Sequence, residues 1–67
     1  MRGGTQLGRA RAKSGLSQRD VAEALGVAQS TVCRWEKGER EPRQRHLRAL
    51  AILLRVDVGA LIERRAA

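Results

Sequence analysis

Cysteine is nearly absent from this sequence of 67 residues, in which Cys33 stands alone. A single cysteine cannot form an intramolecular disulfide bond, and it cannot build a zinc site from several thiolates. His46 is likewise the only histidine, with no cysteine or carboxylate at metal-ligand spacing, and we expect a solvated residue at a helix start. The sequence therefore predicts no metal site, no cofactor and a reducing compartment, which we take to be the cytoplasm.

Aromatic residues are also scarce, since Trp35 is the only one and neither phenylalanine nor tyrosine occurs. Proteins that bind single-stranded nucleic acid, or RNA through a sheet, stack bases on several aromatic side chains. This composition argues against both classes. No apolar run approaches the ~18 residues that a membrane-spanning helix needs, so no membrane association is expected.

What the sequence has in excess is positive charge, with 14 lysine and arginine residues against 7 acidic ones and a formal net charge of +7. Such an excess on a small surface favours a polyanionic partner, either nucleic acid or an anionic membrane. An ordinary solvated surface would carry the same charge. Net charge alone therefore does not choose between these interpretations.

The hydrophobic pattern is helical throughout, and no stretch alternates with period two for long enough to form a strand. Ser17 and Asp20 have the spacing of a capping box, and Gly26 and Gly38 follow the second and third helical segments, where a helix commonly ends. A chain of this length makes one domain. We predict a compact all-α domain of five short helices over about residues 5–14, 18–25, 29–37, 44–54 and 58–65, with Asp57 capping the last and a basic tail at 64–67.

The helix predicted over residues 29–37 has two faces of different chemistry. Val32 and Trp35 fall on one side, where they are expected to pack into the core, and Glu36 lies beside them. The opposite face carries hydrogen-bond donors and cations: Gln29, Ser30, Cys33, Arg34 and Lys37. None of these groups is a general acid or base, but all can reach base edges or phosphates.

The preceding helix and turn add a second local pattern. Ala22 is small enough for two helices to cross closely, Gly26 allows a sharp turn, and Val32 locks the second helix onto the first. This is the stereochemistry of a helix-turn-helix, whose second helix enters the DNA major groove. Together with the capping box, the polar face and the charge, it predicts recognition of double-stranded DNA.

The stretch GLSQRDVAEALGVAQSTVCRWEKGEREP, residues 15–42, resembles the helix-turn-helix domain of the Cro and CI repressor family, the XRE-like regulators. The resemblance implies a lambda-repressor-like fold, extending to about Ile62, in a bacterial or phage-encoded dimer whose half-sites lie ~34 Å apart. It also implies an ion pair between Arg11 and Glu36. The positions that it assigns to base reading are Gln29, Ser30, Thr31, Cys33 and Arg34, and those that it assigns to DNA phosphates are Gln18, Lys37, Arg40 and Arg43.

Three positions depart from the pattern of that family. Ala28 replaces the serine or threonine usual at the N-cap of the recognition helix, with an expected cost of ~1 kcal/mol. Arg55 stands where glycine commonly ends the fourth helix, so a left-handed conformation there would be strained or absent. Gln44 occupies a position that is usually apolar. We therefore expect a thin margin of stability, to which dimerisation or DNA binding would add.

A second apolar strip on the fourth helix has its own interpretation. Ile52 and Leu53 lie roughly opposite the core-facing leucines of that helix, and a chain this short is not expected to cover both sides. With Val58 or Val56, and with Ile62, they predict a twofold homodimer contact. The alternative is that the last helix folds over them.

The sequence thus predicts a small, non-enzymatic transcription regulator that binds double-stranded operator DNA, an inverted repeat, as a dimeric repressor. No small-molecule ligand is expected. Two alternatives stay open: an antitoxin-like or adaptor module that uses the same fold to bind a protein, and a nonspecific basic nucleic-acid binder. Replacing Arg34 or Gln29 separates them, because only a sequence reader would lose affinity for one operator alone.

Overall fold

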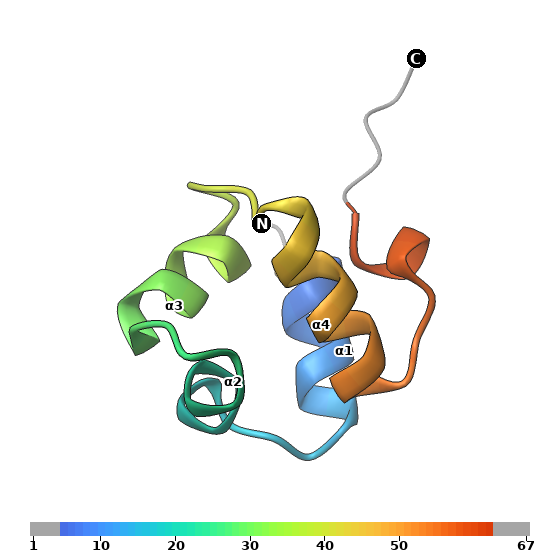
Figure 1. The fold of residues 1–67 in the computed structure, drawn as a ribbon, viewed down its shortest axis with the longest axis horizontal. Coiled ribbons are helices and arrows are strands. Elements are labelled where there is room, and N and C mark those ends of the chain that lie inside the picture. The colour runs from blue at the N-terminus through green and yellow to red at the C-terminus, as the bar shows by residue number, and fades with distance from the viewer. Residues whose placement is uncertain (1–4, 63–67) are drawn as a thin grey trace.

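The computed structural model describes residues 5–62, which form four α-helices and one short 3-10 helix (Figure 1). In chain order these are α1 (Gln6–Lys13), α2 (Gln18–Leu25), α3 (Gln29–Lys37), α4 (Gln44–Leu54) and the 3-10 helix η1 (Val58–Leu61). The part of the chain that the structure describes contains no strand. The all-α class predicted from the sequence is therefore confirmed.

The prediction of a fifth α-helix is wrong. Residues 58–61 form a single 3-10 turn, and Ile62 is extended, with φ −95° and ψ 127°. The side chain of Asp57 makes no capping hydrogen bond, and Gly59 lowers the helix propensity of a segment that is already short. The expected end of this helix at about residue 65, and the basic tail that includes Arg64 and Arg65, lie outside the described residues.

Local sequence signals account for where the other helices begin and end. The Thr5 hydroxyl accepts a hydrogen bond from the Gly8 N–H (3.2 Å) at the start of α1. Ser17 and Asp20 form the expected capping box at α2, with the Asp20 N–H donating to Ser17 Oγ and the Ser17 N–H to Asp20 Oδ2, each at 2.9 Å. Gly26 ends α2 in the left-handed conformation, at φ 73°. These bonds use backbone groups that a helix end leaves unsatisfied.

Arg55 ends α4 in the left-handed conformation, at φ 59° and ψ 48°. Its N–H donates to carbonyls in the last turn of the helix, and the Val56 N–H reaches the Ala51 carbonyl at 3.0 Å. This is the geometry that glycine adopts without steric penalty, whereas a residue with a Cβ atom pays ~1–2 kcal/mol. Of the two outcomes expected from the sequence, the strained conformation is the one observed.

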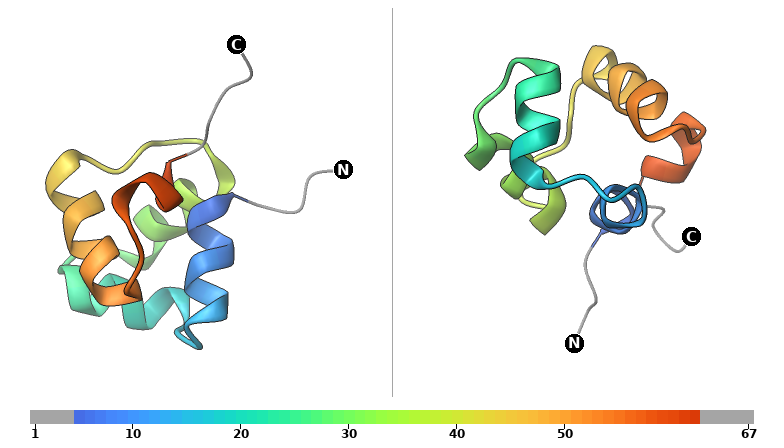
Figure 2. Two further views of the ribbon diagram at one scale, coloured as in Figure 1. Left: turned by 90° about the vertical axis from the view of Figure 1, so that its right-hand side faces the viewer. Right: turned by 90° about the horizontal axis from the view of Figure 1, so that it is seen from below.

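The helices pack in the order that a helix-turn-helix requires. α2 packs against both α3 and α4, and α1 packs against α3 and η1. Figure 2 shows α2 and α3 on one side of the molecule and η1 on the other, with α1 and α4 between them. The fully buried side chains Val21, Val32 and Leu50 join α2, α3 and α4 at the centre of the core. Burial of each contributes roughly 1.5–3 kcal/mol to folding.

Candidate nucleic-acid interface

The outer face of α3 is polar and open to solvent. Val32 is fully buried and Trp35 is 6% exposed, so this stripe anchors α3 on the core. The residues on the opposite face are exposed: Gln29, Ser30, Arg34 and Lys37. Thr31 and Cys33, which the family resemblance also assigned to base reading, are half-buried at the margins of that face. Cys33 is a free thiol.

A hydrogen-bonded network holds the inner side of α3. Arg11 of α1 donates from Nε to Glu36 Oε2 at 2.5 Å and from Nη2 to Glu36 Oε1 at 3.1 Å. Arg11 Nη1 also donates to the Leu16 carbonyl at 2.7 Å. The hydrogen bond to Glu36 raises the pKa of Arg11, despite the opposing effect of burial. The pair therefore ties α1, α3 and the loop before α2 together.

Gln18 belongs to the same network. Its Nε2 donates to Glu36 Oε1 at 3.0 Å, which links the start of α2 to the end of α3. One amide hydrogen and the amide oxygen remain for other partners. The structure thus brings Gln18 to the junction of the two motif helices, oriented by a carboxylate that α3 supplies.

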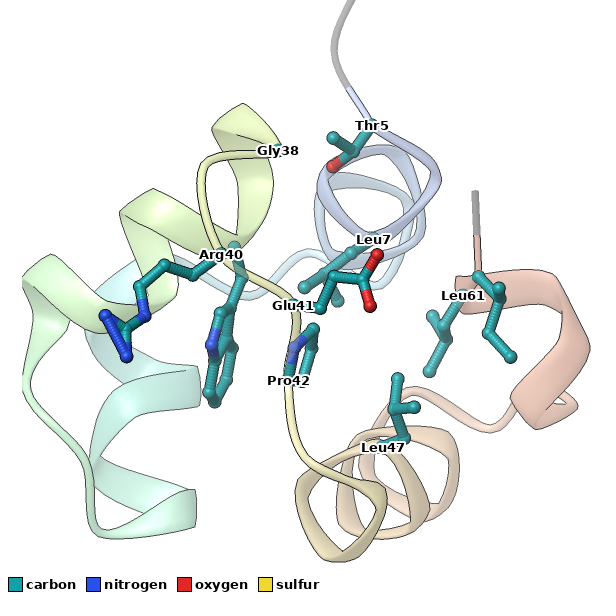
Figure 3. A pocket seen from close by; sticks show the side chains of 10 residues that line it. Thr5, Leu7, Gly38, Arg40, Glu41, Pro42, Leu47 and Leu61 are labelled. Carbon is teal, nitrogen blue, oxygen red and sulfur yellow. The ribbon is translucent and has the colours of Figure 1, made fainter. Parts of the chain in front are cut away.

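The loop after α3 brings further cations to this side of the molecule. Gly38 is left-handed, at φ 79°, and the chain folds back so that the Glu39 N–H donates to the Arg34 carbonyl at 3.0 Å. The exposed Arg40 follows, and its side chain extends toward α3 (Figure 3). Arg43, also exposed, is the N-cap residue of α4, whose first turn has no side-chain cap and no acidic residue.

A polar hollow of about 330 Å³ lies between α3, this loop and the start of α4. Three arginines line it, together with one acidic side chain, so its surroundings carry a net positive charge. The uncapped N-terminus of α4 adds the positive end of a helix dipole, which favours an anion there. The lining residues are Thr31, Arg34, Trp35, Arg40, Glu41, Arg43 and His46.

The sequence profile of the helix-turn-helix family matches residues 7–61 of this chain. The chain belongs to the XRE-type helix-turn-helix family. This family comprises Cro- and CI-like DNA-binding regulators, so the chain is a DNA-binding regulatory domain in this general sense. No curated protein sequence matches it.

Two residues of this helix-turn-helix domain have contacts that the sequence did not predict. A Cβ atom added at Gly8 would lie 3.3 Å from Glu36 Oε1, so the glycine lets α1 approach the network closely. A glycine inside a helix was the available signal, because it lowers helix propensity and often marks a close approach. His46 is half-buried rather than solvated, with its ring centroid 5.2 Å from that of Trp35 and Nδ1 buried without a hydrogen-bond partner among the described residues.

A second, apolar cleft of about 250 Å³ lies between α1, the loop after α3, α4 and η1 (Figure 3). Leu7, Pro42, Leu47 and Leu61 surround it, and Glu41 lies over it.

Within residues 5–62 of the helix-turn-helix domain, no cluster of three potential metal ligands occurs. None of the described helices is long and apolar enough to cross a bilayer.

The side chains predicted to form a dimer contact differ in exposure. Ile52 is 79% exposed and Ile62 is 45% exposed, whereas Leu53 and Val58 are half-buried against the core of the helix-turn-helix domain. Val56 is also partly covered. The structure therefore leaves Ile52 as the most open apolar side chain of the set, on the outer side of α4.

Proposed function

We propose that this domain reads double-stranded DNA by inserting α3 into the major groove. The observation that carries the proposal is the division of α3, in which Val32 and Trp35 are buried while Gln29, Ser30 and Arg34 are exposed together. Glutamine can bond adenine through N6 and N7, and arginine can bond guanine through O6 and N7. Each such pair discriminates against a wrong base by ~1–3 kcal/mol.

The cations around α3 position the domain on the DNA backbone. Lys37, Arg40 and Arg43 are exposed, and the last two border the positively charged hollow at the start of α4. Gln18 donates its remaining amide N–H to a phosphate oxygen while its hydrogen bond to Glu36 holds the side chain in place. These contacts are sequence-independent and weaken as the salt concentration rises. Thr31 and Cys33 contribute at the margins of the reading face.

The regulator acts as a homodimer on an inverted repeat and represses by occupying an operator. Exposure of Ile52 supports a twofold contact centred on the outer side of α4, with Leu53, Val58 and Ile62 beside it. Two copies of α3 related by a twofold axis would meet successive major grooves about one helical turn apart. The bacterial cytoplasm is the compartment that this function implies.

Selection of bound fragments from random duplex DNA at moderate salt tests the proposal. We expect an inverted repeat to emerge, and Arg34→Ala to cost ~1–3 kcal/mol of binding and relax specificity at one position per half-site. Lys37→Gln is the contrasting variant. It should weaken binding to all DNA sequences equally and reduce the slope of log affinity against log salt concentration by about 1. If no sequence motif emerges, the chain is not a sequence reader; if Arg34→Ala changes no DNA binding, the adaptor function is favoured.

A further inference from the structure

An open groove of about 600 Å³ lies between α1, the C-terminal end of α4 and η1. Figure 2 shows these elements side by side, and Figure 1 shows α3 on the other side of the molecule. The groove therefore lies away from the face that we assign to DNA. Its lining residues are Gln6, Arg9, Ala10, Lys13, Ser14, Leu54, Arg55, Val56 and Ala60.

Three exposed cations border this groove, and no acidic residue is among its lining residues. Arg9 and Lys13 come from successive turns of α1, and Arg55 comes from the end of α4. The side chains of all three make no hydrogen bond or ion pair with any of residues 5–62. We call the surface formed by Arg9, Lys13 and Arg55, with the apolar residues between them, the basic groove.

The floor of the basic groove is apolar. Leu54 is 4% exposed and Val56 is half-buried, and Ala10 and Ala60 add methyl groups, while Gln6 and Ser14 are the uncharged polar residues of the lining. A ligand seated there can bury an apolar side chain while its anionic groups meet the cations at the rim. The backbone of a DNA duplex offers phosphates and deoxyribose but no projecting apolar side chain, so it matches the cations of the groove better than its apolar floor.

Arg55 supplies an independent observation. It is the only residue other than glycine with positive φ in the described part of the chain. Glycine would relieve the steric conflict of its Cβ atom, yet an arginine occupies the position. Residues held in costly backbone conformations concentrate at functional sites, and this residue is one of those that line the groove.

We propose that the basic groove is a docking surface for an acidic segment of a partner protein. Aspartate and glutamate side chains of the segment pair with Arg9, Lys13 and Arg55, and an apolar side chain between them rests on Leu54 and Val56. Arginine binds carboxylates through two parallel hydrogen bonds, which gives the contact direction as well as charge complementarity. Because the groove and α3 lie on different sides, the domain can hold DNA and this partner at once. The inference does not depend on the proposed DNA function.

The test uses a short fluorescein-labelled peptide in which glutamate and aspartate residues flank two leucines, titrated with the protein by fluorescence anisotropy. We expect binding that weakens with salt, and NMR shift changes at Ala10, Arg55 and Ala60 rather than in α3. Arg9→Gln with Lys13→Gln should weaken binding about fivefold to tenfold, as the loss of two exposed charge pairs predicts. The same peptide with its acids replaced by amides should not bind.

Matched variants separate docking from net charge and from unfolding. Arg45→Gln with Arg48→Gln removes the same charge from the exposed side of α4 and should leave peptide affinity unchanged within about twofold. Arg55→Gly should lower the affinity for the peptide while making the fold more stable. A loss of binding in this variant therefore cannot come from unfolding. Absence of peptide binding, or an equal loss in the Arg45 and Arg48 control, overturns the proposal.

Duplex DNA distinguishes the two inferences. Arg9→Gln with Lys13→Gln should leave the sequence selected by α3 unchanged. If this variant instead loses affinity for DNA and keeps its affinity for the peptide, the groove is a nucleic-acid surface and the docking proposal is wrong. If the protein binds the acidic peptide but selects no DNA motif, the proposed DNA function is wrong and the docking proposal is still supported.

Discussion

At the scale of single residues, Glu36 is the group on which the geometry of the motif depends. Its carboxylate accepts hydrogen bonds from Arg11 Nε, Arg11 Nη2 and Gln18 Nε2, and the side chains of Arg11 and Glu36 are only 19% and 10% exposed. One carboxylate thus connects α1, α2 and α3. Water screens this pair far less than an exposed one, so the network contributes both stability and orientation.

Glu36→Gln should lower the free energy of unfolding by about 2 kcal/mol, because it leaves the Arg11 guanidinium half-buried without its counter-charge. Urea denaturation followed by circular dichroism measures this. Glu23→Gln is the control, since Glu23 pairs with Arg19 at 3.2 Å with both side chains mostly exposed. That change should cost less than about 0.5 kcal/mol. Equal losses for the two variants would show that the inner network adds no more stability than an exposed ion pair.

Asp20 should make stability depend on pH at the acidic end. Hydrogen bonds from Ser17, first from its backbone N–H, hold the pKa of the Asp20 carboxyl below its ordinary value. Because the folded pKa is lower than the unfolded one, this stabilisation is complete above the unfolded pKa of ~3.9 and is lost as the pH falls through the folded pKa.

Asp20→Asn tests this expectation. Thermal unfolding between about pH 2 and pH 6 should show a destabilised variant near pH 6 whose deficit shrinks as the pH falls. In a Ser17→Ala background, the pH dependence of the deficit should be smaller, because the hydroxyl contact is gone. A deficit that stays constant across the range would contradict this account.

At the scale of elements, α3 is held in place by its packing rather than by its own ends. Ala28 provides no side-chain cap, so α3 relies on its packing, on the hydrogen bonds of Glu36 and on the left-handed Gly38 at its end. Most helical stability in proteins comes from such burial, which explains how a helix of 9 residues persists without an N-cap. The segment after Asp57 has one buried anchor, Leu61, and stays a 3-10 turn.

Ala28→Ser should therefore stabilise the domain by about 1 kcal/mol, because the added hydroxyl can accept a hydrogen bond from the first turn of α3. The measurement is the shift of the urea midpoint at constant m-value. Ala24→Ser is the matched control: Ala24 is exposed inside α2, where serine should cost a few tenths of a kcal/mol. A gain at both positions would mean that the cap is not responsible.

At the scale of the whole molecule, the distribution of charge and apolar surface separates three surfaces. The polar face of α3 carries the groups assigned to DNA, the basic groove lies near η1, and Ile52 is exposed on the outer side of α4. Because α3 and the basic groove lie on different sides of the molecule, the proposed DNA and the proposed acidic segment would not compete for one surface. A domain this small buries a limited core, so the proposed dimer would add to its stability.

Ile52→Lys should abolish the proposed homodimer, because a lysine on each copy places two like charges at a twofold contact. Sedimentation equilibrium should then give a monomer at concentrations where the unmodified chain is a dimer, and affinity for a full inverted repeat should fall toward that for one half-site. Ala12→Lys, which adds a lysine at an exposed position of α1, is the control. A monomeric unmodified chain at high micromolar concentration without DNA would rule out the dimer.

Much of this architecture could be predicted from the sequence alone. The ends of α2 and α3, and the division of α3 into a buried and an exposed face, follow from local signals: the Ser17–Asp20 capping box, two glycines and helical periodicity. Local rules fail where the local preference is weak, as in residues 58–61, and at Arg55 they left two outcomes open between which the structure decided. The ion pair between Arg11 and Glu36 was predicted from the family resemblance and not from local signals.

Only the tertiary structure decided which residues of different helices lie in contact. The hydrogen bond of Gln18 to Glu36, the approach of α1 to Glu36 at Gly8 and the tilted ring contact of His46 with Trp35 each join residues from different helices. The convergence of Arg9, Lys13 and Arg55 around one groove is of the same kind. The sequence determined the helices and their faces because those depend on neighbours along the chain. The contacts and grooves depend on how helices cross, which the core packing sets.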